Sequence, residues 1–322
     1  MKILFEHSGI LPVKKYGGTE RIIFWHMKEL VRHGHEVLLV GHPESEVERF
    51  GIKLIPRSDN GDWRPLIPND VDLIHLFYTP SYEFEKPVMV TIEGNGHPGE
   101  KFHINTVFVS AKHAANHGSN QFVYNGLDFE EYPKVTATRS RWDDFLFLAR
   151  ASWKVKNLTH CVKACKKSEK NLHIAGGRKF SFSRKIRSYG MVDQVKKREL
   201  LSRVDALLWP VRWHEPFGIA IIEAYSAGIP VIGSSYGSLN ELINEDVGVI
   251  CNNFNEFQEV LSRNENTFNS DTIRNFVEKK FSVEVMTWCY AKCYERILDG
   301  ESLNRSEPAY LDDKGPEDLL PF

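Results

Sequence analysis

The sequence has no run of about 20 apolar residues, the length that a membrane-spanning helix needs. It also lacks a signal-peptide pattern, because Met1 and Lys2 lead directly into a short apolar stretch. These two absences argue against an integral membrane protein and against a secreted one. We therefore predict a cytoplasmic protein.

Cysteine is scarce and shows no metal-binding or disulfide pattern. The chain has five cysteines and no Cys-x-x-Cys pair. An odd number fits a reducing compartment and argues against a disulfide framework or a zinc site. We expect these side chains to serve packing; they are Cys161, Cys165, Cys251, Cys289 and Cys293.

An excess of charge of one sign is also missing. The 41 Lys and Arg residues oppose 43 Asp and Glu residues, for a net charge of −2. This balance argues against a dedicated nucleic-acid-binding protein. Hydrophobic residues make up 42% of the chain, enough for ordinary cores, and the length of 322 residues favours two domains.

Two ligand signatures are absent where they would be expected. The first glycine-rich loop, Gly17-Gly18, is not a G-x-G-x-x-G motif, so it predicts no dinucleotide site. No Asp-x-Asp pair stands at the end of a predicted strand; Asp143-Asp144 and Asp312-Asp313 are badly placed to hold a divalent ion. We expect no cofactor and no metal.

The most informative stretch is 205–233, which predicts strand, loop, helix and strand. Asp205–Pro210 is a short apolar run typical of a buried parallel strand. Ile219–Ala227 favours a helix that is apolar on nearly every side and is therefore buried. Glu223 lies in the middle of this helix, and a buried carboxylate is costly unless a partner satisfies it.

Glu215 lies at the start of the loop before this helix. Between the two glutamates, Gly218 precedes a helix start whose free N–H groups and dipole favour an anion. Phosphate contacts together with two carboxylates that accept hydroxyls describe a site for a nucleotide sugar. The alternative is that Glu223 pairs with a nearby Arg or Lys and that Glu215 is a solvated loop residue.

These residues also carry a family resemblance. The pattern E-P-F-G-x-x-x-x-E-A-x-x-A-G-x-P-V, residues 215–231, resembles the E-x7-E signature of family-4 retaining glycosyltransferases. The resemblance covers roughly residues 1–298 and implies an α/β protein of the GT-B fold, with two Rossmann-like domains facing a cleft. It also implies metal-independent, retaining transfer from a nucleotide-diphosphate sugar, with a UDP-sugar favoured and a GDP-sugar next.

The resemblance assigns roles within this signature. Glu223 is implied to accept hydrogen bonds from the donor ribose hydroxyls, and Glu215 to hold a hydroxyl of the donor sugar. The backbone N–H groups of Phe217, Gly218 and Ile219 are implied to contact the sugar and the phosphate.

A second match follows the strand predicted over 144–150. The family reads G-R-x-x-x-x-K-G there, and Arg150 matches its arginine. Lys156 matches the lysine with one residue of extra spacing, and Lys154 is the competing candidate. Two cations here would neutralise a diphosphate and steady the leaving group. A solvated basic loop is the alternative.

Two further candidates lie in the first domain. Gly17 and Gly18 precede a helix that we expect Thr19 to cap. The pattern G-G-x-E-R resembles the family's first loop, whose glycines face the donor diphosphate and the acceptor. A simple turn is the alternative.

After the strand over 87–92, the family usually has T-x-H-G, whereas this chain has Glu93 at the histidine position and His97 four residues later. Glu93 or His97 is expected to contact the acceptor, unless His97 only bonds to the loop backbone.

Apolar periodicity places the remaining elements. We expect a first domain over 1–136, joined by a final helix and tail over about 283–322, and a second domain over 137–282, with the boundary in the polar segment 133–141. Strands are expected over 2–7, 35–41, 52–55, 71–77, 87–92, 106–110, 121–124, 144–150, 172–175, 205–210, 230–233 and 247–250. Helices are expected over 19–33, 111–117, 158–168, 195–203, 219–227 and 283–298.

The acceptor is not specified by any motif. A glycan, a lipid-linked sugar and a small molecule all remain open, and the basic residues near 14–32 suggest a weak peripheral membrane contact. Two rival functions share the donor site: a sugar-nucleotide 2-epimerase, and a donor-binding protein that has lost transfer activity. Acceptor-dependent release of free nucleotide separates the three.

Overall fold

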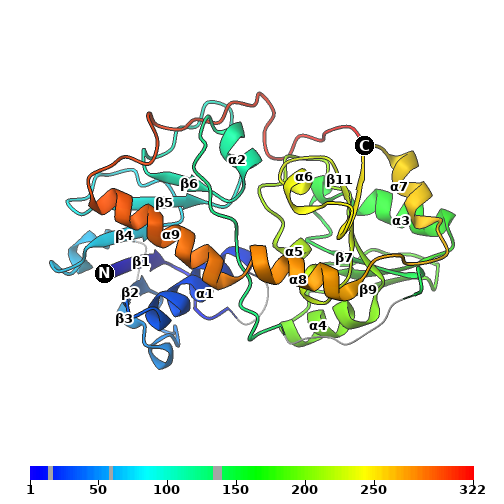
Figure 1. The fold of residues 1–322 in the computed structure, drawn as a ribbon, viewed down its shortest axis with the longest axis horizontal. Helices are drawn as coiled ribbons and strands as arrows, with labels where there is room; N and C mark the ends of the chain where they lie inside the picture. The colour runs from blue at the N-terminus through cyan, green and yellow to red at the C-terminus, as the bar shows by residue number, and fades with distance from the viewer. Residues whose placement is uncertain (14–16, 58–60, 133–139) are drawn as a thin grey trace. The chain divides into compact units, whose positions relative to one another are not determined.

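The computed structural model describes residues 1–13, 17–57, 61–132 and 140–322. The chain forms two compact units (Figure 1). The first unit contains Met1–Val13, Gly17–Gly126 and Val283–Asp313, and the second contains Leu127–Ser282 and Lys314–Phe322. The units therefore divide at Gly126, before the predicted boundary at 136, which lies outside the described residues. Residues 314–322 group with the second unit rather than with the first.

The first unit is built on a six-stranded sheet with the order β3-β2-β1-β4-β5-β6. All neighbouring strands are parallel, and most strand residues are buried apolar side chains, as expected of a sheet covered on both faces. The strands are β1 (Lys2–His7), β2 (Glu36–Gly41), β3 (Lys53–Pro56), β4 (Leu73–Leu76), β5 (Val88–Ile92) and β6 (Thr106–Phe108). The helices are α1 (Gly18–Arg32), α2 (Ala111–Asn116) and α9 (Val283–Leu298).

The second unit repeats this architecture with the strand order β12-β11-β10-β7-β8-β9, again all parallel. Its strands are β7 (Asp144–Leu148), β8 (Asn171–Ala175), β9 (Ile186–Gly190), β10 (Ala206–Trp209), β11 (Val231–Ser234) and β12 (Gly248–Cys251). Its helices are α3 (Leu158–Lys167), α4 (Gln194–Arg203), α5 (Ile219–Ser226), α6 (Leu239–Leu242), α7 (Phe254–Leu261) and α8 (Ser270–Lys280). The predicted fold class, two Rossmann-like α/β units, is confirmed.

Two local predictions are wrong, and one strand was not predicted. Residues 121–124 form no strand. They make only an isolated parallel bridge, between Phe122 and Phe108, and Phe108 is the last residue of β6. Strand β9 lies in a basic segment whose composition hid it. Thr19 does not cap α1: the helix already begins at Gly18, after Gly17, and no side chain caps it.

Helix α9 is held to the first unit by buried polar side chains. The Tyr294 hydroxyl lies 2.7 Å from His26 Nε2 and 2.7 Å from His75 Nδ1. His26 Nδ1 in turn lies 2.9 Å from Thr287 Oγ1, and His75 Nε2 lies 2.8 Å from Thr91 Oγ1. Burial lowers the pKa of His26 to about 3 and that of His75 well below its usual value, so both imidazoles are neutral.

The end of the chain docks on the second unit. The Leu320 N–H donates to the Arg212 carbonyl oxygen at 2.8 Å, and Arg212 Nε donates back to the Leu320 carbonyl oxygen at 2.6 Å. Leu320 is buried and Leu319 is exposed, while the Phe322 ring contacts His160 and Phe257. This explains why residues 314–322 belong to the second unit.

Candidate functional site

The candidate residues of the second unit follow the carboxyl ends of its strands, where open α/β sheets bind ligands. Glu215 lies in the loop after β10 and is only 5% exposed. Its Oε2 accepts hydrogen bonds from Lys156 Nζ at 2.6 Å, Trp213 Nε1 at 2.9 Å and Trp209 Nε1 at 3.2 Å. Glu215 is therefore a buried carboxylate whose Oε2 accepts three donors, and the hypothesis that it is a solvated loop residue is wrong.

The Lys156 ammonium is surrounded by three indole rings. Its ammonium lies 4.5 Å from the ring centre of Trp213, 4.9 Å from that of Trp209 and 5.4 Å from that of Trp153. Burial lowers the pKa of Lys156, while the nearby Glu215 carboxylate acts in the opposite direction. Lys154, the competing candidate, is exposed on the same 3₁₀ turn, so the structure places Lys156 beside the first glutamate of the signature.

The loop after β11 fixes the backbone around Glu215. Gly237 has a φ of 65°, and a Cβ there would lie 2.3 Å from both the backbone N and O of Glu215. Ser238 donates its N–H to the Glu215 carbonyl oxygen at 2.9 Å and its hydroxyl to the Phe217 carbonyl oxygen at 2.7 Å. The motif over 215–231 gives no indication of this close packing, because Gly237 lies on a different loop.

Helix α5 begins directly behind this loop. Gly218 is the N-cap, with a φ of 94°, and no side chain caps the helix. The N–H groups of Ile219 and Ala220 therefore have no acceptor within the helix, whereas the Ile221 N–H donates to the Gly218 carbonyl oxygen at 2.9 Å. Phe217 is 2% exposed, so the backbone is held in place by a buried ring. This end of α5 offers donors to an anion.

Glu223 lies farther along α5 and is 5% exposed. Its Oε1 accepts a hydrogen bond from the Tyr132 hydroxyl at 2.5 Å and forms an ion pair with Lys197 of α4. Lys197 also lies 3.3 Å from the Tyr132 hydroxyl. Glu223 thus has the basic partner that the structural alternative predicted, and it does not share a partner with Glu215. Neither Tyr132 nor Lys197 had a signal in the sequence.

Arg150 follows β7 and is exposed. The backbone before it is packed closely against the end of β8: a Cβ at Gly176, which has a φ of 105°, would lie 2.1 Å from the Ala149 carbonyl oxygen. The Arg150 side chain is therefore carried on a well-positioned loop but is itself free to reach a ligand.

In the first unit, Glu93 directly follows β5 and is partly buried. Asn125 Nδ2 donates to its Oε2 at 2.8 Å, whereas Oε1 is buried and has no hydrogen-bond partner among the described residues. Burial raises the pKa of Glu93 to about 7; the bond from Asn125 lowers it and the charge of Glu20 raises it. Asn125 begins the segment Asn125-Gly126-Leu127-Asp128, whose Asn-Gly pair predicts only a tight turn from the sequence.

His97 is exposed, and its backbone N–H donates to Glu100 Oε2 at 2.8 Å. The loop around it is shaped instead by two histidines of the α2 region: His113 Nε2 lies 3.0 Å from the Gly94 carbonyl oxygen, and His117 Nε2 accepts from the Gly96 N–H at 3.2 Å. Both histidines lie in the helix predicted over 111–117, but no pattern in the sequence indicated this role.

Gly17 and Gly18 stand at the start of α1, as predicted. A Cβ on Gly17 would lie 2.8 Å from Glu20 Oε2, so the Glu20 carboxylate folds back over this glycine. Because the charge of Glu20 also acts on Glu93, the helix start and the Glu93 loop share one electrostatic environment. Lys14–Tyr16, just before these glycines, lie outside the described residues.

Within the described ranges, no group of three His, Cys, Asp or Glu side chains is arranged to hold a metal ion. In that same part of the chain, no helix combines the length and the apolar character that crossing a bilayer requires.

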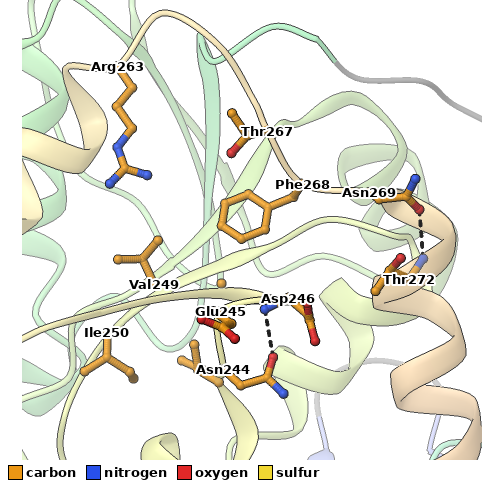
Figure 2. A pocket seen from close by; sticks show the side chains of 12 residues that line it. Asn244, Glu245, Asp246, Val249, Ile250, Arg263, Thr267, Phe268, Asn269 and Thr272 are labelled. Atoms are coloured by element: carbon orange, nitrogen blue, oxygen red, sulfur yellow. Dashed lines mark hydrogen bonds between the residues drawn. The ribbon is translucent and has the colours of Figure 1, made fainter.

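A separate pocket lies on the second unit beside β12 (Figure 2). Its lining comes from the loop before β12, from β12 itself and from the start of α8, and it includes Asp246, Val249 and Phe268. Ser270 at the start of α8 packs against Gly228, which precedes β11. This pocket is therefore near the amino ends of the strands, and the Glu215 loop is at their carboxyl ends.

The fold and the site together define a class. The two parallel six-stranded α/β units of this chain match the crystal structure of AviGT4, a glycosyltransferase involved in avilamycin A biosynthesis, with a TM-score of 0.76, 20% identity and coverage of 93% of this chain and 98% of that one. The structure of Anabaena HepE in complex with UDP and glucose matches with a TM-score of 0.66 and 16% identity, over 92% of this chain and 99% of that one. The protein has the GT-B glycosyltransferase fold.

The sequence then gives the family. Residues 128–264 match the family model of glycosyl transferases group 1, and this part of the chain belongs to that family. A glycogen synthase of Mycobacterium tuberculosis is 30% identical over 148 residues, covering 40% of this chain and 35% of that protein. A phosphatidyl-myo-inositol mannosyltransferase of Propionibacterium freudenreichii is 27% identical over 140 residues, covering 40% and 36%. The chain thus matches about a third of the length of these relatives, and the family predicted from residues 215–231 is confirmed.

Proposed function

We propose that this protein is a retaining, metal-independent glycosyltransferase that moves a sugar from a nucleotide-diphosphate sugar to a glycan, lipid-linked or small-molecule acceptor. The observation that carries the proposal is the buried Lys156–Glu215 pair, 2.6 Å apart, beside the uncapped start of α5. This arrangement combines a cation and free N–H groups for a diphosphate with a carboxylate for a sugar hydroxyl.

The leaving group needs positive charge. Departure of the sugar leaves negative charge on the diphosphate, and preorganised donors stabilise such charge most strongly where water is excluded. Lys156 is buried, the first N–H groups of α5 have no acceptor within the helix, and Arg150 is exposed on a packed loop. We assign these three groups to the diphosphate.

The two glutamates bind hydroxyls. Glu215 Oε2 already accepts three donors, and its buried position makes it suited to orient a hydroxyl of the donor sugar. Glu223 accepts the Tyr132 hydroxyl, and we propose that a ribose hydroxyl of the donor replaces this hydroxyl while Lys197 stays paired. An exchange of one hydroxyl for another keeps the buried carboxylate satisfied.

Glu93 is assigned to the acceptor side. Its buried Oε1 lacks a partner, so an incoming hydroxyl would satisfy an oxygen that is otherwise left without one. With a pKa of about 7, Glu93 exchanges a proton near neutral pH. His97 is exposed on the same loop and is assigned an acceptor contact as well.

UDP-sugar is the favoured donor and GDP-sugar the next. The solved structures of HepE with UDP give support for uridine, since HepE shares the fold. A GDP-sugar remains the second candidate that the family resemblance implies.

Calorimetric titration with UDP, GDP and ADP, without metal and then with EDTA, tests the donor site. We expect one nucleotide to bind, EDTA to have no effect, and Glu223→Gln to weaken binding about tenfold, the loss of roughly one charge-assisted hydrogen bond. The matched control is Glu259→Gln, because Glu259 is exposed on α7. Failure of all three nucleotides to bind would contradict the proposal and favour a vestigial site.

Release of free nucleotide then separates the proposed reaction from its rivals. A transferase releases nucleotide only when an acceptor is present. A 2-epimerase would convert the donor sugar without any second substrate, and a binding protein would do neither.

A further inference from the structure

The crossover between β8 and β9 carries exposed cations and aromatic rings for which the transfer reaction has no use. Residues 178–187 contain five basic residues and no acidic one, and all five are exposed. Phe182 is 94% exposed and Phe180 is 81% exposed, the two highest values among the large hydrophobic side chains of the described residues. The five basic residues are Arg178, Lys179, Arg184, Lys185 and Arg187.

The path of the backbone explains this exposure. A connection between parallel strands usually contains a helix that covers the sheet, but residues 176–185 form none. Gly177 instead pairs antiparallel with Gly190, and Ser188 Oγ lies 3.0 Å from the Lys179 N and 3.2 Å from its carbonyl oxygen. The segment thus starts along the outer side of β9, the last strand of the sheet.

Most of the positive charge in this segment is not neutralised. Arg178, Lys179 and Arg184 make no ion pair with any residue in the described ranges. Lys185 lies 3.7 Å from the carboxylate of Glu169, which is itself well exposed. The overall net charge of −2 makes this local surplus a feature of one segment, not of the whole surface.

The two phenylalanines form one apolar projection. Their ring centres are 4.9 Å apart with an angle of 80° between the planes, an edge-to-face contact. Leaving two such rings in water is unfavourable unless a partner covers them. A nucleic acid would use separate open ring faces for base stacking, whereas a joined pair surrounded by cations matches the interface of an anionic bilayer.

We propose that residues 178–187 form a docking surface for an anionic lipid bilayer. Phe180 and Phe182 enter the boundary between headgroups and acyl chains, and the basic side chains contact the headgroup phosphates. The sequence suggested a weak contact through the basic residues of 14–32. Among the described residues of that region, Arg21 is buried and Arg32 is paired with Glu29 at 3.1 Å, and Lys14 and Lys15 lie outside the described residues.

Vesicle flotation without any nucleotide or acceptor tests this surface independently of the transfer reaction. We expect the protein to float with phosphatidylcholine vesicles that contain phosphatidylglycerol and not with pure phosphatidylcholine vesicles. The triple variant R178Q/K179Q/R184Q should bind on the order of a hundredfold more weakly, about fivefold for each cation, and F180S/F182S should also lose binding.

One control variant removes the same number of positive charges elsewhere on the chain, and a second removes an exposed aromatic side chain elsewhere. K166Q/K167Q/K279Q neutralises three exposed lysines, and W288S removes a side chain that is 62% exposed. Both should bind as the unmodified chain does. Circular dichroism spectra should show that every variant remains folded.

Three outcomes would overturn the proposal. The first is no flotation with anionic vesicles. The second is equal loss of binding in K166Q/K167Q/K279Q, which would indicate only general attraction of charge. The third is a tighter, Phe180- and Phe182-dependent complex with single-stranded RNA than with vesicles, which would assign the surface to nucleic acid.

Discussion

At the scale of single residues, the candidate site is a set of buried charges with specified partners. Glu215 is satisfied by one ammonium and two indoles, and Glu223 by one ammonium and one phenol. Glu93 differs from both, because one of its oxygens is buried and has no partner in the part of the chain that the structure describes. A carboxylate in that state favours its protonated form, which is a testable property.

Glu93→Gln should therefore alter how stability depends on pH. The pKa of Glu93 is raised from the usual 4.5 to about 7 in the folded chain. Between these values the folded chain holds a proton that the unfolded chain has released, so this group lowers the free energy of unfolding as pH rises. Glutamine removes this loss, and we expect the variant to gain about 1–3 kcal/mol over the unmodified chain near pH 8 and little near pH 5.

Urea denaturation at both pH values measures this difference. Titration of all other groups cancels when the variant is compared with the unmodified chain at the same pH. Glu259→Gln, at an exposed position, should change stability little at either pH. An equal effect of Glu93→Gln at both pH values would show that Glu93 is ionised throughout.

At the scale of elements, the donor loop depends on glycines that no side chain could replace. The loop after β10 carries Glu215, but its backbone conformation is set by Gly237 and Ser238 in the loop after β11. A signature read along one segment cannot show this, because the constraint comes from the neighbouring strand.

Gly237→Ala should weaken both the fold and the binding of nucleotide. The new Cβ would lie 2.3 Å from the Glu215 backbone, and φ is 65° at this position. The left-handed conformation alone costs about 1–2 kcal/mol, and the clash should raise the total to at least about 3 kcal/mol. Gly300→Ala is the control, since Gly300 has a φ of 85° but no atom within 4 Å of the added Cβ.

Denaturation midpoints and calorimetric titration of the same two variants measure these effects. Gly300→Ala should show only the smaller conformational cost and unchanged nucleotide affinity. Similar losses in both variants would mean that the packing of Gly237 on Glu215 contributes nothing.

At the scale of the whole molecule, segments distant in sequence complete each unit. Helix α9 follows Leu127–Ser282 of the second unit in the chain, yet its Tyr294 hydroxyl bridges His26 of α1 and His75 of β4. Leu320 likewise returns to Arg212, more than a hundred residues earlier. Each unit therefore depends on residues that the chain supplies late.

Tyr294→Phe should destabilise the first unit more than Tyr290→Phe. The first change leaves two buried imidazole nitrogens without their partner, at a cost of about 2–4 kcal/mol. The second removes only a 3.3 Å contact with Thr91, with an expected cost of about 1 kcal/mol or less. Both tyrosines are fully buried on α9, so the pair is matched in burial. Thermal and urea denaturation give the comparison, and equal losses would contradict a bridging role for Tyr294.

The sequence by itself determined the family and most of the order of the elements, with β9 as the missed strand. The strand at 2–7 and the helix at 283–298 were predicted with the bounds that the structure has, and β10 and α5 lie within a residue or so of their predicted ranges. These features depend on local periodicity and on turn residues, which are properties of adjacent positions. The resemblance of residues 215–231 succeeded for the same reason, because the whole motif is contiguous.

Only the tertiary structure decided which partners the charged residues have. The structure pairs Glu223 with Lys197, and Glu215 with Lys156 rather than with Lys154. It also pairs Glu93 with Asn125. Each of these partners comes from another element. The exposure of Phe180 and Phe182 in the crossover before β9 is likewise a property of the tertiary structure. Contacts between distant segments depend on how the strands and helices pack. Neither the composition of a segment nor the spacing of residues along it predicts that packing.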